Sequence, residues 1–256
     1  MRLSMLLRFV STTLVGLFIS ATAYAIPAIV VAPGTSPAGG YLALSLFGIS
    51  PIAGVGDETI TNYNVPSFNY AGQSWTRLGI VSNGYVVVGG GTSADVQAIN
   101  ADLPNLSAPG NILAPFWTNL NPALAGAMRI AALTDGLDTW VVVDWAAVGS
   151  ANDSNELNSF EIWIGINTDT NPGEDISFVY DAVGNGDGGL LTVGAQDISR
   201  TVGDSYYFNG TGALPISGTQ LRVTTRDLPI SIPEPATLVL FGLGLVGLAV
   251  SRRHKY

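Results

Sequence analysis

The feature that most restricts the fold of this chain is the regular spacing of its turn-forming residues. Glycine, asparagine, aspartate, threonine and serine interrupt the interior of the sequence about every eight to twelve residues. Short strands joined by tight turns have this spacing, and no long interior stretch carries the i, i+3, i+4, i+7 apolar pattern of an amphipathic helix. A chain of 256 residues is long enough for one sizeable core. We therefore expect a single all-β domain.

Several interior segments have the composition and the alternation of β-strands. Within residues 160–167 every even position is apolar, whereas Glu161, Trp163 and Asn167 fall on the opposite face. We expect one face of each strand to be in the core. The expected strands are 139–145, 160–167, 175–181 and 190–197, with further candidates at 41–47 and 220–225.

A hairpin turn is expected at Asn83-Gly84, which separates two β-rich runs. Both residue types tolerate positive φ, as a two-residue hairpin turn requires. The hairpin and the other strands provide enough antiparallel edges for two packed sheets. The predicted fold is an antiparallel β-sandwich, with a single barrel as the alternative.

Residues 1–25 have the three parts of a secretory signal peptide. Two arginines form a short basic start, a mostly apolar run follows, and Ala23 and Ala25 supply the small side chains that precede a signal peptidase cleavage site. The apolar run would extend only about 16 Å as a helix, against a hydrocarbon core of about 30 Å. We expect the mature chain to begin at Ile26, with a linker at 26–39 and the sandwich domain at 40–230.

The charge distribution changes when the two ends are set aside. Five of the ten basic residues lie at the ends but only one of the nineteen acids does, so residues 26–232 carry a net charge of −13 and no lysine. Such a surface repels nucleic acids and anionic lipid headgroups. We expect no nucleic-acid partner.

The composition also restricts catalytic chemistry. The chain has no cysteine, and its single histidine, His254, lies in the basic cluster at the end. The exported body therefore cannot form a Ser-His-Asp triad, a thiol nucleophile or a zinc site of the usual nitrogen and sulfur ligands. We expect a protein that is not an enzyme and has no cofactor.

Three acids keep a catalytic alternative open. Asp144, Glu161 and Asp175 lie on or beside expected strands, and two carboxyl groups suffice for glycoside hydrolysis. Scattered acids in so acidic a domain are more typical of solvated strand ends, and we favour that interpretation.

Two polar turns offer the oxygen ligands that Ca²⁺ prefers. The first has Asp169, Asn171 and Asp175 at alternating positions, and the second spans 181–189. The first turn lacks the glycine and the bidentate glutamate of an EF-hand loop. Because asparagine, aspartate, glycine and proline are ordinary turn residues, we favour plain turns and leave calcium binding at the first turn open.

A proline-rich stretch at 102–122 contains two adjacent aromatic residues. Pro115 fixes the approach of the chain, and Phe116 and Trp117 then offer about 150 to 250 Å² of mostly apolar surface each. We interpret the aromatic pair as a core anchor beneath a crossover loop, in preference to a ligand platform.

Five short stretches of the body together resemble a known extracellular domain. They are GYLALSLFG at 40–48, GVGDET at 54–59, VSNGYVVVG at 81–89, LAPFWTNLNP at 113–122 and LTVGA at 191–195. In this order they resemble the β-sandwich that follows the catalytic domain of some secreted subtilisin-like serine peptidases. The resemblance implies a non-catalytic sandwich over about residues 40–226. Asn119 stands where that motif has an aspartate, so a cation role of this acid would not carry over.

The end of the chain resembles a PEP-CTERM sorting signal. Residues 231–256 contain Pro233-Glu234-Pro235, then an uncharged apolar segment at 236–250, then a basic end with Arg252, Arg253 and Lys255. The segment would form a transmembrane helix of about 22 Å, and the basic end would hold the C-terminus on the cytoplasmic side. The resemblance implies that a membrane-embedded exosortase recognises Pro233-Glu234-Pro235 and cuts nearby.

Two classes of function remain from the sequence. The first is a non-enzymatic protein of the cell surface or extracellular matrix, tethered to the inner membrane only before processing, with signal peptidase and exosortase as partners during export. The second is an accessory domain that binds carbohydrate, for example extracellular polysaccharide, or calcium.

Overall fold

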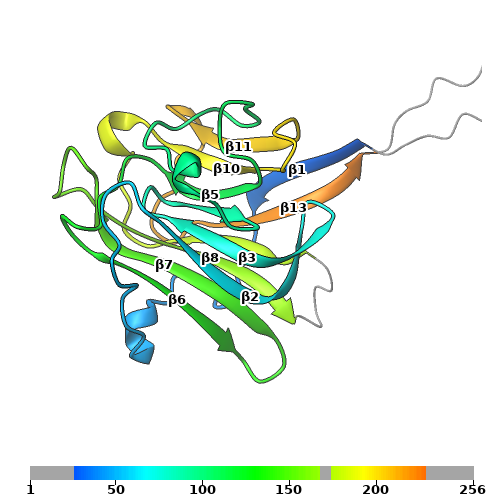
Figure 1. Ribbon diagram of the computed structural model, residues 1–256, viewed down its shortest axis with the longest axis horizontal. Helices are drawn as coiled ribbons and strands as arrows, with labels where there is room; N and C mark the ends of the chain where they lie inside the picture. Colours follow the sequence, from blue (N-terminus) through cyan, green and yellow to red (C-terminus); the bar gives the residue numbers. More distant parts are fainter. Residues whose placement is uncertain (1–25, 168–173, 229–256) are drawn as a thin grey trace, which may run out of the picture. The chain divides into compact units, whose positions relative to one another are not determined.

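The computed structural model describes residues 26–167 and 174–228, and within them the chain forms two β-sheets and three short 3-10 helices (Figure 1). The strands of the six-stranded sheet, in spatial order, are β1 (Ile26–Pro33), β13 (Gln220–Leu228), β9 (Ile176–Tyr180), β8 (Leu157–Asn167), β7 (Thr139–Gly149) and β6 (Ala127–Thr134). Those of the seven-stranded sheet are β12 (Thr211–Gly212), β11 (Gly203–Phe208), β10 (Thr192–Gln196), β5 (Ile112–Trp117), β4 (Tyr85–Val88), β3 (Gln73–Val81) and β2 (Ile60–Tyr70). The strand pairs from β2 to β13 are antiparallel.

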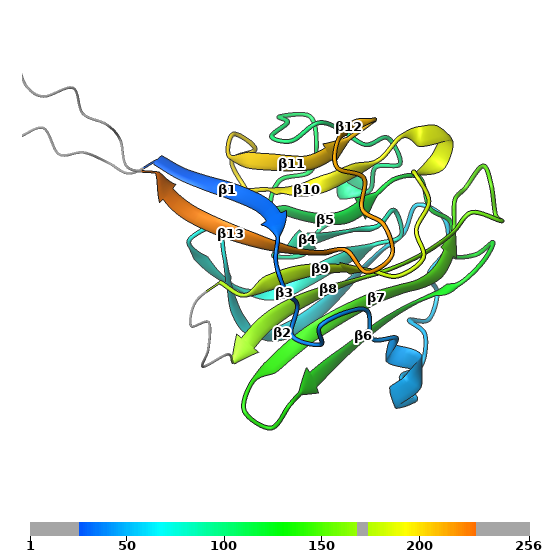
Figure 2. The same ribbon diagram turned by 180° about the vertical axis from the view of Figure 1, so that it is seen from behind.

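The main core lies between the two sheets, which Figure 2 shows as two layers. Phe160 of β8 is stacked on Trp145 of β7 with ring centroids 5.0 Å apart, and it also contacts Phe116 of β5 at 5.2 Å. Aromatic side chains thus join the six-stranded sheet to the seven-stranded one. The predicted β-sandwich is confirmed, and its strands belong to two sheets and not to a single barrel.

Most of the expected strands are present, but residues 41–47 do not form one. They lie in an irregular segment that ends in the 3-10 helix η1 (Leu44–Phe47), and Gly48 closes that helix in the left-handed conformation. The backbone amides of Leu42 and Leu44 donate to carboxylates of β8 and β7 and not to a neighbouring strand. Strand pairing is lost there because acidic side chains accept those hydrogen bonds.

The segment expected to be a linker, residues 26–39, instead contributes a strand of the sandwich. β1 lies beside β13, as Figure 2 shows, and the side chains of Ile29 and Val31 are buried in the main core. The amide of Val31 donates to Asp204 Oδ2 of β11 at 2.8 Å. The apolar, β-branched sequence after Ile26 explains why it folds onto the domain.

The Asn83-Gly84 hairpin is confirmed, with a connection longer than expected. Val81 of β3 pairs with Tyr85 of β4, so three residues connect the strands, and only Gly84 has a positive φ, of 79°. Asn83 is buried, and its Oδ1 accepts a hydrogen bond from the amide of Leu120 at 3.1 Å. The asparagine therefore anchors a distant loop as well as the turn.

Candidate functional site

Residues 36–49, named here the cover segment, lie across the outer face of the six-stranded sheet. They follow β1 and include η1, and Figure 2 shows them crossing β8, β7 and β6 on the side away from the other sheet. Leu44 of the cover segment is fully buried against Trp140, Val142, Trp163 and Val179. This small core, separate from the main one, buries a sheet face that would otherwise be exposed.

Two acids of the sheet lie beneath the cover segment. Asp144 of β7 and Glu161 of β8 are directly opposite each other in register, and both side chains have 0% exposed surface. The interpretation of Asp144 and Glu161 as solvated strand ends is therefore wrong. It failed because the cover segment, which sequence alternation cannot reveal, excludes water from this face.

The cover segment donates hydrogen bonds to both acids. Asp144 Oδ1 accepts from the Tyr41 hydroxyl at 2.8 Å, and Asp144 Oδ2 accepts from the Leu44 amide at 3.1 Å. Glu161 Oε2 accepts from the Leu42 amide at 3.0 Å and from the Trp163 indole at 3.1 Å. Three of these four donors belong to the cover segment, so the acid pair fixes its position.

The electrostatics of the pair disfavour two negative charges, because burial raises the pKa of both acids. Burial, together with the facing Asp144, raises the pKa of Glu161 to about 8, although the Leu42 and Trp163 hydrogen bonds lower it. Burial also raises the pKa of Asp144, although Tyr41, Leu44 and Arg129 lower it. The second oxygen of Glu161, Oε1, is buried and has no hydrogen-bond partner among the described residues. With its pKa near 8, Glu161 is mostly neutral at neutral pH, which avoids a buried charge on a carboxyl group whose second oxygen has no partner.

Asp175 lies farther along the same sheet face and is also buried. Its Oδ1 forms an ion pair with Arg222 Nη1 of β13 at 2.5 Å, and its Oδ2 accepts from the Trp140 indole at 2.9 Å. Both oxygens are thus engaged, and the solvated interpretation is wrong for this acid too, because Asp175 is only 3% exposed. Asp169 and Asn171, the other expected calcium ligands, lie outside the described residues.

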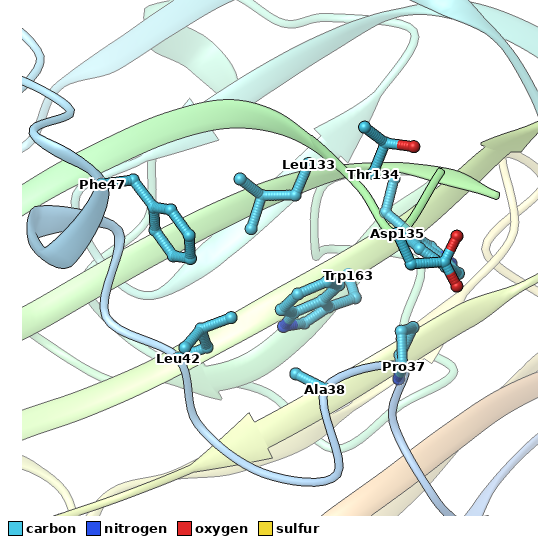
Figure 3. Close-up of a pocket in the computed structure, with 9 residues that line it drawn as sticks. Pro37, Ala38, Leu42, Phe47, Leu133, Thr134, Asp135 and Trp163 are labelled. Carbon is cyan, nitrogen blue, oxygen red and sulfur yellow. The ribbon is translucent and has the colours of Figure 1, made fainter. Parts of the chain in front are cut away.

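Two pockets border the cover segment and share Pro37 and Trp140 as lining residues. The first has a volume of about 190 Å³, and Figure 3 shows Trp163 at its centre, with Leu42 and Phe47 on one side and Asp135 at the rim. The second has a volume of about 420 Å³, and its lining includes the Asp175–Arg222 pair. Both Trp140 and Trp163 use their indole N–H within the protein. Only apolar parts of these rings are therefore available to a ligand.

In the second acidic turn, 181–189, the polar groups of Asp187 form hydrogen bonds within the protein. The carboxylate of Asp187 accepts hydrogen bonds from the backbone and side-chain amides of Asn152, and the Asp187 amide donates to Thr118 Oγ1 at 2.8 Å. No group of three or more His, Cys, Asp or Glu side chains suited to a metal ion occurs in the part of the chain that the structure describes.

The aromatic pair after Pro115 is a core anchor, as expected. Phe116 and Trp117 are fully buried on opposite faces of β5, Phe116 in the main core and Trp117 against Tyr85 at 5.1 Å. Trp117 also donates its indole N–H to the Gln97 carbonyl at 2.9 Å.

The residues predicted to direct export lie outside the described residues. They are the signal peptidase site at Ala23 and Ala25, the sorting motif Pro233, Glu234 and Pro235, and the retention residues Arg252, Arg253 and Lys255. The same holds for the predicted membrane helix at 236–250. Among residues that the structure describes, no helix is long and apolar enough to cross a membrane.

Two family models match the sequence. A model described as NIDO related matches residues 39–237, and a model of the PEP-CTERM protein-sorting motif matches residues 231–253. No curated protein and no solved structure matches the chain. The first match covers most of the described domain, including the cover segment from residue 39, and does not support the resemblance to the sandwich of secreted peptidases. The second match supports the predicted sorting signal.

Proposed function

We propose that this chain, which belongs to the NIDO-related family and carries a PEP-CTERM protein-sorting motif, is a non-enzymatic protein of the cell surface or extracellular matrix. The observation that carries the proposal is the position of the motif, which begins just beyond β13 (Gln220–Leu228), the last strand among the described residues. A cut within the motif would leave every described strand of the sandwich in the released product, which would therefore keep its fold.

The route of export follows from the two ends of the chain. Signal peptidase would cut after Ala25, and the apolar segment at 236–250 would then tether the protein to the inner membrane. Arg252, Arg253 and Lys255 would hold the C-terminus on the cytoplasmic side, because basic residues resist translocation. Exosortase would cut near Pro233-Glu234-Pro235 and send the body to the surface or matrix.

The buried acids support a role without catalysis. A glycosidase needs two carboxyl groups that a glycan can reach, and Asp144 and Glu161 are both closed beneath the cover segment. Asp175 is similarly engaged with Arg222 and Trp140. These acids stabilise the covered face in the structure, and a substrate could reach them only after the cover segment had moved.

Two sets of variants in the tail test the proposal by separating recognition from membrane retention. Glu234→Ala should leave the apolar segment able to insert but block recognition, so that uncut protein accumulates at the inner membrane. Replacing Arg252, Arg253 and Lys255 by glutamine should instead weaken retention of the segment in the membrane. Ile230→Val, just before the matched motif, serves as the control and should be processed normally. Normal processing of the Glu234→Ala variant in cell fractions would contradict the proposed sorting.

A second candidate function, carbohydrate binding, is favoured by the pockets beside the cover segment. Their lining combines apolar and aromatic side chains with a few polar groups, as small-molecule sites do. Calcium binding has less support, because Asp175 is already paired with Arg222. Titration calorimetry with cellohexaose and with CaCl₂ tests both ligands. Phe47→Ala and Asp135→Asn are the informative variants, since both residues are exposed and line the first pocket.

A further inference from the structure

The cover segment is joined to the sheet by polar contacts that converge on the acid pair. Tyr41, Leu42 and Leu44 donate to Asp144 and Glu161, as described above. Two side chains of the sheet donate in the opposite direction: Arg129 Nε of β6 to the Ile49 carbonyl at 3.1 Å, and Gln220 Nε2 of β13 to the Gly39 carbonyl at 3.0 Å. Near the start of the segment, Ser36 donates through its amide and its hydroxyl to Gln220 Oε1, both at 2.8 Å. Only the middle of the segment, from Tyr41 to Leu44, bonds to the acid pair, so a change in the charge of the pair acts there.

The surroundings of the pair provide a cation for only one of the two acids. Arg129 is opposite Asp144 in register, whereas the residue opposite Glu161 on β9 is Val179. The other titratable group that faces the pair is Tyr41, whose pKa is raised above its ordinary value by burial and by Asp144, Glu161 and Asp181. Like charges directly opposite each other on neighbouring strands are destabilising. A second negative charge at Glu161 would therefore lack compensation while the cover segment is closed.

We propose that the cover segment is a proton-dependent latch, closed while Glu161 is neutral and opening locally, with the sandwich intact, when Glu161 ionises. Local opening is feasible because the small core beneath the segment shares no buried residue with the core between the sheets. Opening would hydrate the Glu161 carboxylate and remove the unfavourable burial of its charge.

The direction of the pH dependence follows from the proton affinities of the two states. With the segment closed the pKa of Glu161 is about 8, and with the segment open the hydrated side chain returns to a value near 4.3. The closed state binds the proton more tightly, so rising pH favours opening. The opening constant should increase up to about tenfold per pH unit between about pH 5 and 8, and level off above that range.

Because the chain contains no cysteine, a single introduced cysteine is the only thiol that a reagent can modify, and its modification rate reports opening of the cover segment. Val142 and Val143 are adjacent on β7 and both fully buried, Val142 beneath the cover segment and Val143 between the sheets. The test is the rate at which methyl methanethiosulfonate modifies full-length Val142→Cys and Val143→Cys variants. Each rate is divided by that of the urea-unfolded variant at the same pH, which removes the effect of thiol ionisation.

The latch predicts that the normalised rate at position 142 rises relative to that at position 143 from pH 5 to pH 8. Adding Glu161→Gln should abolish the rise, because glutamine cannot ionise. Glu174→Gln is the matched control, since burial also raises the pKa of Glu174, yet its Oε2 contacts Ala71 and Thr225 outside the cover segment. The rise should persist in that variant.

Two outcomes would overturn the latch. One is a ratio that stays constant from pH 5 to pH 9, and the other is a rise that survives Glu161→Gln. If Val142→Cys does not fold, hydrogen exchange of the Leu42 and Leu44 amides in the unmodified chain gives the same test. After correction for intrinsic exchange, their protection should fall with rising pH, and constant protection would count against the latch.

Discussion

Gly84 in the β3–β4 turn leaves no room for a side chain next to Phe116 of β5. A Cβ atom at Gly84 would overlap the Phe116 carbonyl oxygen, and the Phe116 amide donates to the Gly84 carbonyl at 3.2 Å. Gly84 also has a φ of 79°, in the left-handed region that favours glycine. The turn is therefore fixed by its contact with a third strand as well as by its own conformation.

Gly84→Ala should lower the free energy of unfolding by at least about 2 kcal/mol, because backbone strain and steric overlap both act. Gly218→Ala is the control, since Gly218 has a φ of 83° but no neighbouring atom within 4 Å of the added Cβ. Strain alone should lower its stability by about 1 kcal/mol. Urea denaturation measures the free energy of unfolding of both variants. Equal decreases would show that the contact with Phe116 does not contribute to the stability of the turn.

Arg222→Leu should destabilise the protein by about 3 kcal/mol, because it leaves the Asp175 carboxylate buried without its cation. The Arg222 side chain is 20% exposed, so the expected loss of stability lies at the lower end of the range of about 3 to 5 kcal/mol for breaking a buried ion pair. The double variant Arg222→Leu/Asp175→Asn should recover part of the loss. Arg200→Leu, at an exposed position, should cost less than about 1 kcal/mol. No recovery in the double variant would contradict a charge-based role.

Glu161→Gln should become more stable than the unmodified protein as pH rises. The pKa of Glu161 is raised to about 8 in the folded state, so its contribution to stability is present below its unfolded pKa and is lost as pH rises through 8. Between pH 5 and pH 9 the difference should grow by up to about 4 kcal/mol, and it would stop growing once the cover segment opens. Urea denaturation at the two pH values measures it, and a pH-independent difference would exclude a titrating Glu161.

The purified protein should not hydrolyse peptides, esters or common glycans. The exported body has no histidine or cysteine, and the acid pair Asp144–Glu161 is closed to substrates of this size. The measurement is turnover of chromogenic substrates of each class. Turnover that disappears in Asp144→Asn or Glu161→Gln would show that the pair is catalytic.

The strands most visible in the sequence were those with clear alternation, such as β8, whereas β5 was not recognised. β5 contains Pro115, and proline normally argues against an interior strand. It is tolerated because the β5–β10 register shifts between Thr192 and Gly194, so Pro115 has no residue partner there. A register irregularity between distant segments cannot be read from one sequence.

The covered face was only partly predictable. The sequence placed Glu161 and Trp163 on one face of β8, and a tryptophan on an expected solvent face was a signal that something covers it. The contact that covers it joins Tyr41 to Asp144, more than a hundred positions along the chain. Alternation within a strand carries no information about such a long-range contact, so residues 41–47 of the cover segment were mistaken for a strand.

The most direct test of the proposed sorting is mass spectrometry of the protein recovered from the cell surface or the surrounding medium. Removal of both terminal signals predicts a mature product that begins at Ile26 and lacks peptides from 236–256. Recovery of surface or secreted protein that still carries those C-terminal peptides would show that the segment is a permanent anchor, which would contradict the proposed processing.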